Sequence, residues 1–558
     1  MSTAAPSKTG MRVSPWVLLA LGCLLCLLLL VLWPLLTLFR QSAIDPGTGQ
    51  LGWHGFRVFF FDDPRYTTAF FNSLVLGAIC TVGALALAAP LAYVVARYEF
   101  RGKSLVALLP LATIVLPDFL VAQAWLMLLG NNGVLRRTLE DFGLDLPSFY
   151  GWFGMIFTLV FNLYAYAYLG MFAALKAIDG AIEEAAVNLG ASNLRRALTV
   201  TFPVLLPALL VNAMIVFTLA FDNFSIPMIL GGKVEVLSSL IYITFLSELG
   251  GNPVMQSVLA VVSVLLVALV LFVQKWVVER KTYQMHQGRA PLPVRARGWT
   301  AQVLTGGALL LIAVSLLPAA MMVIGAFTKA RGPVMRYGQW TLENMERALS
   351  TAPTPIINSL LLASAATLAG TVFATIASYL IVKKRLPVVS LLDYVAMLPL
   401  AVSGTVLGIA LIHTYNSGPV VLTGTWLIMA AALFVRKVPF SIRSASASLY
   451  NIPDSMEEAA INLGASPLRS FWTVVLPVMK PAIWAAAILM WVTSLAEISA
   501  TIVLYFGGME TMPIEMFNQI DAGYLARASA YGVVLMLAII IPLFIATRFF
   551  KLDLFASR

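Results

Sequence analysis

Three acidic side chains lie within long apolar stretches of the chain: Asp118, Asp222 and Glu497. An ionised carboxylate is costly inside a membrane, so such residues are candidates for lining a solute path. Carboxylates suit a cationic solute. Asp222 lies 19 residues after Pro203 and Glu497 lies 20 residues after Pro477, so we expect Asp222 and Glu497 to be equivalent positions of a repeat.

Other polar residues close to these carboxylates extend the candidate path: Asn223, Ser225, Ser494 and Ser499. The alternative is that all these groups hydrogen-bond between helices or lie close to the membrane interface. Gln123 and His413 are weaker candidates, because a lone histidine at the end of a span is more often structural.

No residues in this chain predict catalysis. A phosphate-binding loop has the form Gly-x-x-x-x-Gly-Lys-Ser/Thr. Gly102-Lys103-Ser104 has its ending, but position 97 is arginine and the segment follows an apolar helix rather than a strand. We therefore expect no catalytic residue, no metal site and no cofactor bound by this chain.

A ten-residue segment occurs twice, as EEAAVNLGAS from Glu183 and as EEAAINLGAS from Glu457, with an offset of 274. Residues 183–207 and 457–481 are identical at 16 of 25 positions. A weaker pair of segments, 72–74 and 358–360, reads Asn-Ser-Leu in both places. Repetition at this distance predicts two homologous halves.

Each repeated segment predicts a short helix within a loop. In the second copy, Ser455 and Glu458 have the spacing of a capping box, which favours a helix start. Glu457 to Leu463 can form two turns, and Gly464 suits the end of a helix.

Composition predicts an all-α polytopic membrane protein. Of the 558 residues, 60% are hydrophobic and 11% are charged, whereas soluble domains carry about 25% charged residues. We expect about twelve transmembrane helices, six in each half. The candidate spans are 16–39, 70–96, 104–129, 150–175, 205–230, 254–275, 301–327, 356–382, 389–414, 420–445, 480–506 and 528–549.

The basic residues predict the orientation. With the N-terminus in the cytoplasm, 25 of the 36 Lys and Arg residues fall in cytoplasmic segments, Arg436 and Lys437 among them. Both termini and both repeated loops are then cytoplasmic. Six spans per half make the repeats parallel: 1–275 is the first half, 276–300 a cytoplasmic linker and 301–558 the second half. The net charge of +10 is spread over short loops, which does not favour nucleic acid.

The repeated loop also resembles the signature of a known family. Glu-Ala-Ala, three residues, Gly, and twelve residues to a Pro is similar to the loop of the membrane subunits of ABC importers. The resemblance implies a type I importer (MetI-like permease) fold, in which this loop is a coupling helix that docks on the ATPase. It implies ATPase contact for six small residues: Ala185, Ala186, Gly190, Ala459, Ala460 and Gly464. Glu184 and Glu458 would pin the loop or meet the partner, or else only cap and solubilise it.

Both halves together resemble the fused permeases of the ferric-iron importer group. The implied protein lies in the bacterial inner membrane and works by alternating access. Its implied partners are a periplasmic solute-binding protein and two separate ATPase subunits, which would use ATP with its magnesium. Residues 222–227, followed by Gly231-Gly232, are also similar to permeases for polyamines and 2-aminoethylphosphonate. The expected solute is ferric iron, then 2-aminoethylphosphonate or another phosphorylated molecule, then a polyamine or thiamine. An ion-driven secondary transporter is the alternative class, but many of these have inverted repeats.

Overall fold

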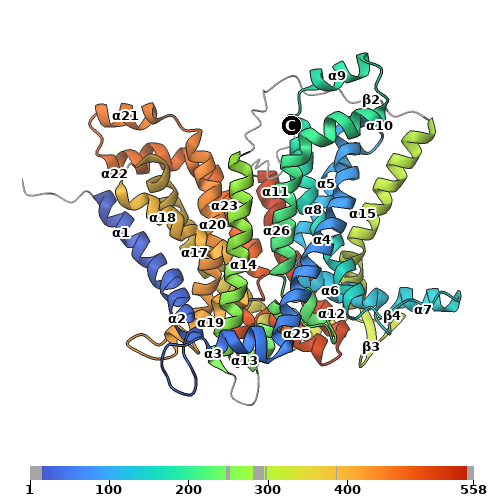
Figure 1. Ribbon diagram of the computed structural model, residues 1–558, viewed down its shortest axis with the longest axis horizontal. Coiled ribbons are helices and arrows are strands. Elements are labelled where there is room, and N and C mark those ends of the chain that lie inside the picture. The colour runs from blue at the N-terminus through green and yellow to red at the C-terminus, as the bar shows by residue number, and fades with distance from the viewer. Residues whose placement is uncertain (1–14, 247–251, 281–293, 296–297, 385, 550–558) are drawn as a thin grey trace, which may run out of the picture.

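The computed structural model describes residues 15–246, 252–280, 294–295, 298–384 and 386–549, and these are mainly helical (Figure 1). The strands described are short. β1 (Tyr98–Glu99) pairs in parallel with β2 (Val294–Arg295), and β3 (Thr328–Arg331) pairs antiparallel with β4 (Val334–Trp340). The expected all-α polytopic fold is confirmed.

The helices follow one another with short breaks. Those before residue 281 are α1 (Pro15–Leu27), η1 (Leu28–Leu32), α2 (Trp33–Ser42), α3 (His54–Arg57), η2 (Val58–Asp62), α4 (Pro64–Arg97), α5 (Lys103–Val115), α6 (Asp118–Leu129), α7 (Val134–Asp141), α8 (Trp152–Ala177), α9 (Gly180–Asn188), α10 (Asn193–Arg196), η3 (Ala197–Thr201), α11 (Phe202–Phe221), α12 (Ser225–Leu230), α13 (Leu237–Leu246) and α14 (Pro253–Arg280). Those after residue 297 are α15 (Gly298–Ala326), α16 (Glu343–Glu346), η4 (Arg347–Thr351), α17 (Thr354–Lys383), α18 (Pro387–Met397), η5 (Leu398–Ala401), α19 (Gly404–Tyr415), α20 (Trp426–Tyr450), α21 (Asp454–Asn462), α22 (Pro467–Ser470), η6 (Phe471–Val475), α23 (Leu476–Leu495), α24 (Thr501–Leu504), α25 (Met512–Asp521) and α26 (Leu525–Phe549).

Fewer helices than expected are continuous spans. Nine helices in the described residues are long and apolar enough to cross a membrane, or ten if a bent pair is counted. The predicted span 104–129 is divided between α5 and α6, because Leu116 is extended before Pro117. The predicted span 389–414 bends by 113° between η5 and α19. The predicted span 420–445 corresponds to α20, which carries Arg436 and Lys437 and is not among the nine.

The two halves follow one plan. Helix α4 packs against α8 and α11, and α17 packs in the same way against α20 and α23. Matched hydrogen bonds support this equivalence. The Ser73 hydroxyl accepts a bond from the backbone N–H of Leu237 at 2.7 Å, and the Ser359 hydroxyl accepts one from that of Met512 at 2.7 Å. The Asn-Ser-Leu pair in the sequence therefore marks equivalent contacts.

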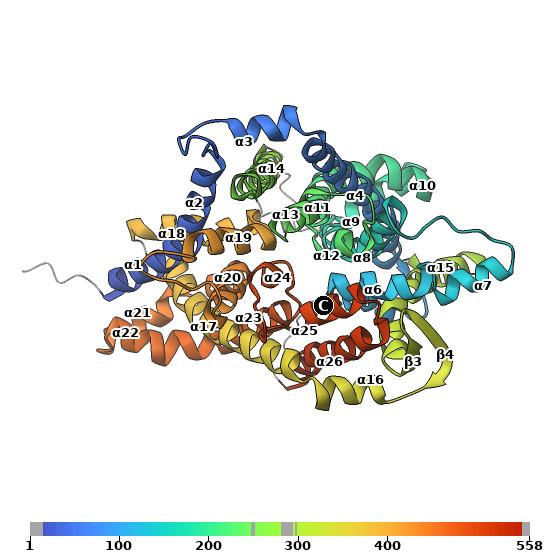
Figure 2. The same ribbon diagram turned by 90° about the horizontal axis from the view of Figure 1, so that it is seen from below.

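The first helix of each half packs against the other half (Figures 1 and 2). Helix α1 contacts α17 and α18, and α2 contacts α19. In return, α15 contacts α5 and α6. The halves are thus interlocked. Most of the expected linker, 281–293 and 296–297, lies outside the described residues.

Helices α9 and α21, which contain the repeated segments, lie at the same end of the molecule on opposite sides (Figure 1). We call them the loop helices. The opposite end carries α7, β3, β4, α13 and α25.

Candidate transport cavity and loop helices

A cavity of about 320 Å³ lies between the two halves, at the breaks in their helices. Its walls come from the α5–α6 break, the α11–α12 turn, η5, α20 and the α23–α24 turn. Six of the residues expected to form the solute path line this one cavity: Asp118, Asp222, Asn223, Ser225, Glu497 and Ser499. The seventh, Ser494, does not.

These polar side chains lie at helix breaks because the ends of helices leave backbone N–H and C=O groups that need hydrogen-bond partners. Such groups must be satisfied within the protein at membrane depth. The Asn223 side chain accepts a hydrogen bond from the N–H of Ile226 at 3.0 Å, at the start of α12. The Glu497 side chain accepts one from the N–H of Ala500 at 3.3 Å, just before α24. Each side chain thus stabilises a turn and faces the cavity.

The first half contributes a carboxylate held by two amides. Asn162 on α8 donates to Oδ1 of Asp118 at 2.6 Å, and Asn223 donates to Oδ2 at 2.6 Å. Both donors are neutral. The amides therefore fix the carboxyl group in place without supplying a countercharge.

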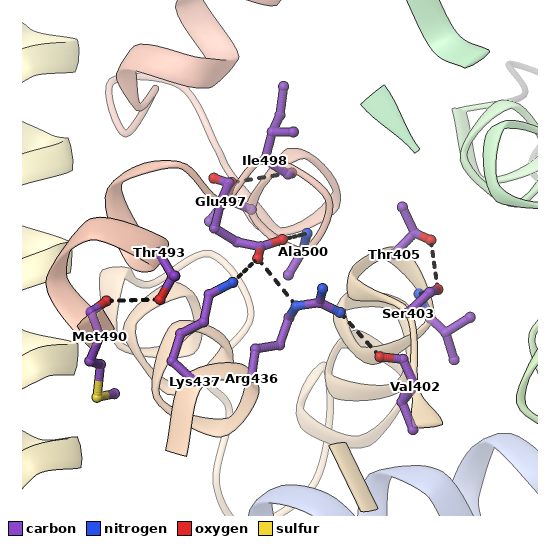
Figure 3. Close-up of polar contacts among 12 residues, drawn as sticks. Val402, Ser403, Thr405, Arg436, Lys437, Met490, Thr493, Glu497, Ile498 and Ala500 are labelled. Carbon is purple, nitrogen blue, oxygen red and sulfur yellow. Dashed lines mark hydrogen bonds and ion pairs between the residues drawn. The ribbon is translucent and has the colours of Figure 1, made fainter. Parts of the chain in front are cut away.

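The second half contributes a carboxylate held by two cations (Figure 3). Oε2 of Glu497 lies 3.2 Å from Nε of Arg436 and 2.5 Å from Nζ of Lys437. The Arg436 guanidinium also donates to the carbonyl oxygen of Val402 at 3.1 Å. The charges of these three side chains sum to +1.

Arg436 and Lys437 were missing from the expected path and were counted instead with the cytoplasmic loops. The structure corrects this assignment, because both side chains line the cavity from the middle of α20. The repeat offers a signal for Arg436, since an offset of 274 aligns it with Asn162, which also contacts a cavity carboxylate.

The expected equivalence of Asp222 and Glu497 is wrong. The offset of 274 aligns Glu497 with Asn223 and Ala500 with Ile226. The hydrogen bonds agree, because Asn223 and Glu497 each accept from the residue three positions later. Asp222 aligns with Ala496 and therefore has no acidic counterpart.

Asp222 lies close to Ser403 and within electrostatic range of Arg436. In the described part of the chain, no cation lies within ion-pair distance of its carboxylate. It is therefore a cavity carboxylate whose charge is not neutralised by a direct ion pair.

The two weaker candidates, Gln123 and His413, and the expected path residue Ser494 lie elsewhere. Gln123 donates to the Ser529 hydroxyl and to the Leu525 carbonyl oxygen, each at 3.0 Å. It therefore hydrogen-bonds between helices, which was the alternative to a place in the solute path. His413 lies 3.3 Å from Gln256. The hydroxyl of Ser494 is buried without a hydrogen-bond partner in the described residues. None of these three lines the cavity.

The loop helices begin differently but end alike. The Asp179 side chain caps α9 by accepting from the N–H of Ala181 at 3.0 Å. The expected capping box of Ser455 and Glu458 is wrong, because α21 already begins at Asp454, after Pro453. Gly190 and Gly464 follow the two helices with φ of 83° and 92°, a left-handed conformation that suits glycine.

The first glutamate of each repeated segment anchors its loop helix. Glu183 is buried and lies 2.9 Å from Nη2 of Arg97, at the end of α4. Glu457 is buried and lies 2.7 Å from Nζ of Lys384, just after α17. The Tyr379 hydroxyl donates to Glu457 at 2.6 Å. Each loop helix is thus tied to the end of the second long helix of its half.

The second glutamates, Glu184 and Glu458, are exposed, so they do not pin the loops. The small residues expected to face the ATPase vary in exposure: Ala185 and Ala459 are exposed, Ala186 and Ala460 are half-buried, and Gly190 and Gly464 are exposed. Sequence reasoning missed Leu189 and Leu463, which are 89% and 90% exposed.

Comparison with known proteins agrees with this architecture. Residues 88–283 match the family profile described as "Binding-protein-dependent transport system inner membrane component". The ferric transport system permease protein FbpB of Actinobacillus pleuropneumoniae is 28% identical over 491 residues, covering 85% of this chain and 70% of that protein. The putative 2-aminoethylphosphonate transport system permease protein PhnU of Salmonella typhimurium is 31% identical over 250 residues, covering 43% of this chain and 86% of that protein.

The fold and the paired loop helices define a polytopic membrane permease. The chain belongs to the family of inner membrane components of binding-protein-dependent transport systems. It is the permease subunit of an ABC importer and is not itself an enzyme. Permease subunits of this kind bind no cofactor themselves.

Proposed function

We propose that this chain moves ferric iron, delivered by a periplasmic binding protein, into the cytoplasm by alternating access. The two halves would be residues 1–275 and 301–558, joined by 276–300. Two copies of a separate ATPase would drive the cycle. Similarity to ferric permeases over 85% of the chain supports iron as the solute.

The observation that carries the coupling role is the anchoring of the loop helices. A buried glutamate fixes each helix to a long span, so a push on the helix is transmitted to the span rather than lost in a flexible loop. Among the described residues of the two loops, Leu189 and Leu463 are the most exposed large apolar side chains. Exposed apolar groups on a soluble face commonly mark a partner surface. We assign this face to the ATPase and to the cytoplasm, with both termini on that side.

A second candidate solute is 2-aminoethylphosphonate. The relative PhnU, 31% identical over 250 residues, supports it. Arg436 and Lys437 in the cavity also support an anionic group on the solute.

Reconstitution tests the proposal. The chain would be placed in vesicles with its ATPase and binding protein, and ATP hydrolysis and uptake would be measured with ferric iron or 2-aminoethylphosphonate. Stimulation by iron is the expected result. Stimulation by the phosphonate alone would replace iron with the second candidate.

Substitution of the loop leucines tests the coupling role. Leu189→Asp with Leu463→Asp should abolish ATPase association, whereas Leu144→Asp, at an exposed leucine in the loop after α7, far from the loop helices, is the matched control. Normal association of the double variant would contradict the assignment of the loop helices.

A further inference from the structure

The cavity has walls of opposite charge. The first-half wall carries the carboxylates of Asp118 and Asp222, a formal charge of −2. The second-half wall carries Arg436, Lys437 and Glu497, a formal charge of +1. Charges that only stabilised the protein would be expected to pair with each other at this depth. In the described residues, neither Asp118 nor Asp222 has a cation at ion-pair distance.

The two walls differ because the repeats differ at equivalent positions of one scaffold. Asn162 is replaced by Arg436, and Asn223 by Glu497, at an offset of 274. Asp118 is replaced by Gly404 at the offset of 286 that relates the Asn-Ser-Leu segments. The backbone plan is shared, so the difference in charge arises from the side chains alone.

We propose that the cavity recognises a solute of mixed charge, with its anionic group against Arg436 and Lys437 and its cationic centre against Asp118 and Asp222. A lone cation would be repelled by the second wall, and a lone anion by the first, in surroundings that screen charge weakly. This inference rests on the proposed transport role. Two sources share the required chemistry: a zwitterion such as 2-aminoethylphosphonate, or ferric iron held by a carboxylate chelator.

The preference of the cavity for a mixed-charge solute is tested by direct binding to the permease–ATPase complex in vesicles. The binding protein is left out because its own selectivity would mask that of the cavity. Calorimetry would compare 2-aminoethylphosphonate and ferric citrate with ethylphosphonate, which lacks the cation, and ethylamine, which lacks the anion. At least one mixed-charge probe should bind tighter than both single-charge probes, by on the order of tenfold, the effect of one charged hydrogen bond. Equal binding by single-charge probes, or binding by none of the four, would overturn the proposal.

Two substitutions test which wall binds the cationic group of the solute and which binds its anionic group. Asp222→Asn breaks no ion pair in the described residues, and it should remove the preference over ethylphosphonate. Arg436→Gln leaves Glu497 paired with Lys437, and it should remove the preference over ethylamine. Arg443→Gln is the matched control, because Arg443 is also on α20 but pairs with Asp393 at 3.2 Å, outside the cavity. Equal effects of both cavity variants on all probes would contradict the assignment.

The result separates this inference from the choice of iron. Binding of the phosphonate but not of ferric citrate would remove the ferric proposal and leave the mixed-charge cavity intact. ATP-dependent iron uptake without any charge preference in binding would overturn the mixed-charge cavity and leave the ferric proposal intact. The comparison of the four probes uses the wild-type protein, so its outcome does not depend on whether any variant folds.

Discussion

Replacing Glu183 with glutamine should loosen α9 from the end of α4. The Arg97 and Glu183 side chains are 4% and 5% exposed, so the guanidinium has little access to water. Glutamine keeps the shape but removes the charge, which leaves Arg97 buried with an uncompensated cation. Breaking a buried pair in this way costs about 3–5 kcal/mol. The Thr201 hydroxyl also donates to Glu183, at 2.9 Å, and would lose a charged acceptor.

Hydrogen exchange of the α9 backbone measures this loss. Because 1.4 kcal/mol corresponds to a factor of ten, exchange should accelerate roughly a hundredfold or more if α9 opens locally. ATP hydrolysis coupled to transport should fall with it. Glu184→Gln is the matched control, because Glu184 is the exposed neighbour on the same helix; exposed substitutions usually change stability by less than about 0.5 kcal/mol. Similar exchange rates in the two variants would refute the anchoring role of Glu183.

Three further substitutions test particular contacts. Gly190→Ala should destabilise the end of α9 by about 1–2 kcal/mol through its positive φ, whereas Gly190→Asn should cost less, as hydrogen exchange would show; equal effects would exclude backbone strain. Ser359→Ala should cost about 1–3 kcal/mol in thermal unfolding, because the buried N–H of Met512 loses its acceptor; an unchanged melting temperature would contradict this. Gly408→Ala should destabilise the protein by about 1–3 kcal/mol, because the added carbon would lie 2.1 Å from Val503 Cγ2, and unchanged thermal stability would show that Val503 moves aside.

The long apolar stretches and the repeated segment were sufficient to predict the helical class and the position of the loop helices. The repeated segment is identical enough to fix its register, and glycine at its end has a local physical reason. The split between α5 and α6 was harder to predict from the sequence, because a proline inside an apolar run can either kink or divide a span. Pro110 lies within α5, whereas Pro117 separates α5 from α6.

The cations of the second-half wall of the cavity were not predicted, for a related reason. Arg436 and Lys437 were assigned to a loop because cations are expected outside the membrane. Their placement depends on Glu497, which is 60 residues or more away in the sequence and comes close only in the folded chain. A buried ion pair is a property of two distant segments, so neither segment alone reveals it.

The interlocking of the halves has a consequence for synthesis. Helices α1 and α2 are made first, but their partners in the other half are made more than 300 residues later. The Thr37 hydroxyl lies 2.6 Å from that of Thr414, and the Tyr415 hydroxyl donates to the Leu29 carbonyl oxygen at 2.8 Å. These contacts span 377 and 386 residues of chain. This first span, Pro15–Ser42, must therefore wait in the membrane while most of the chain is translated, and its docking is a late step in folding.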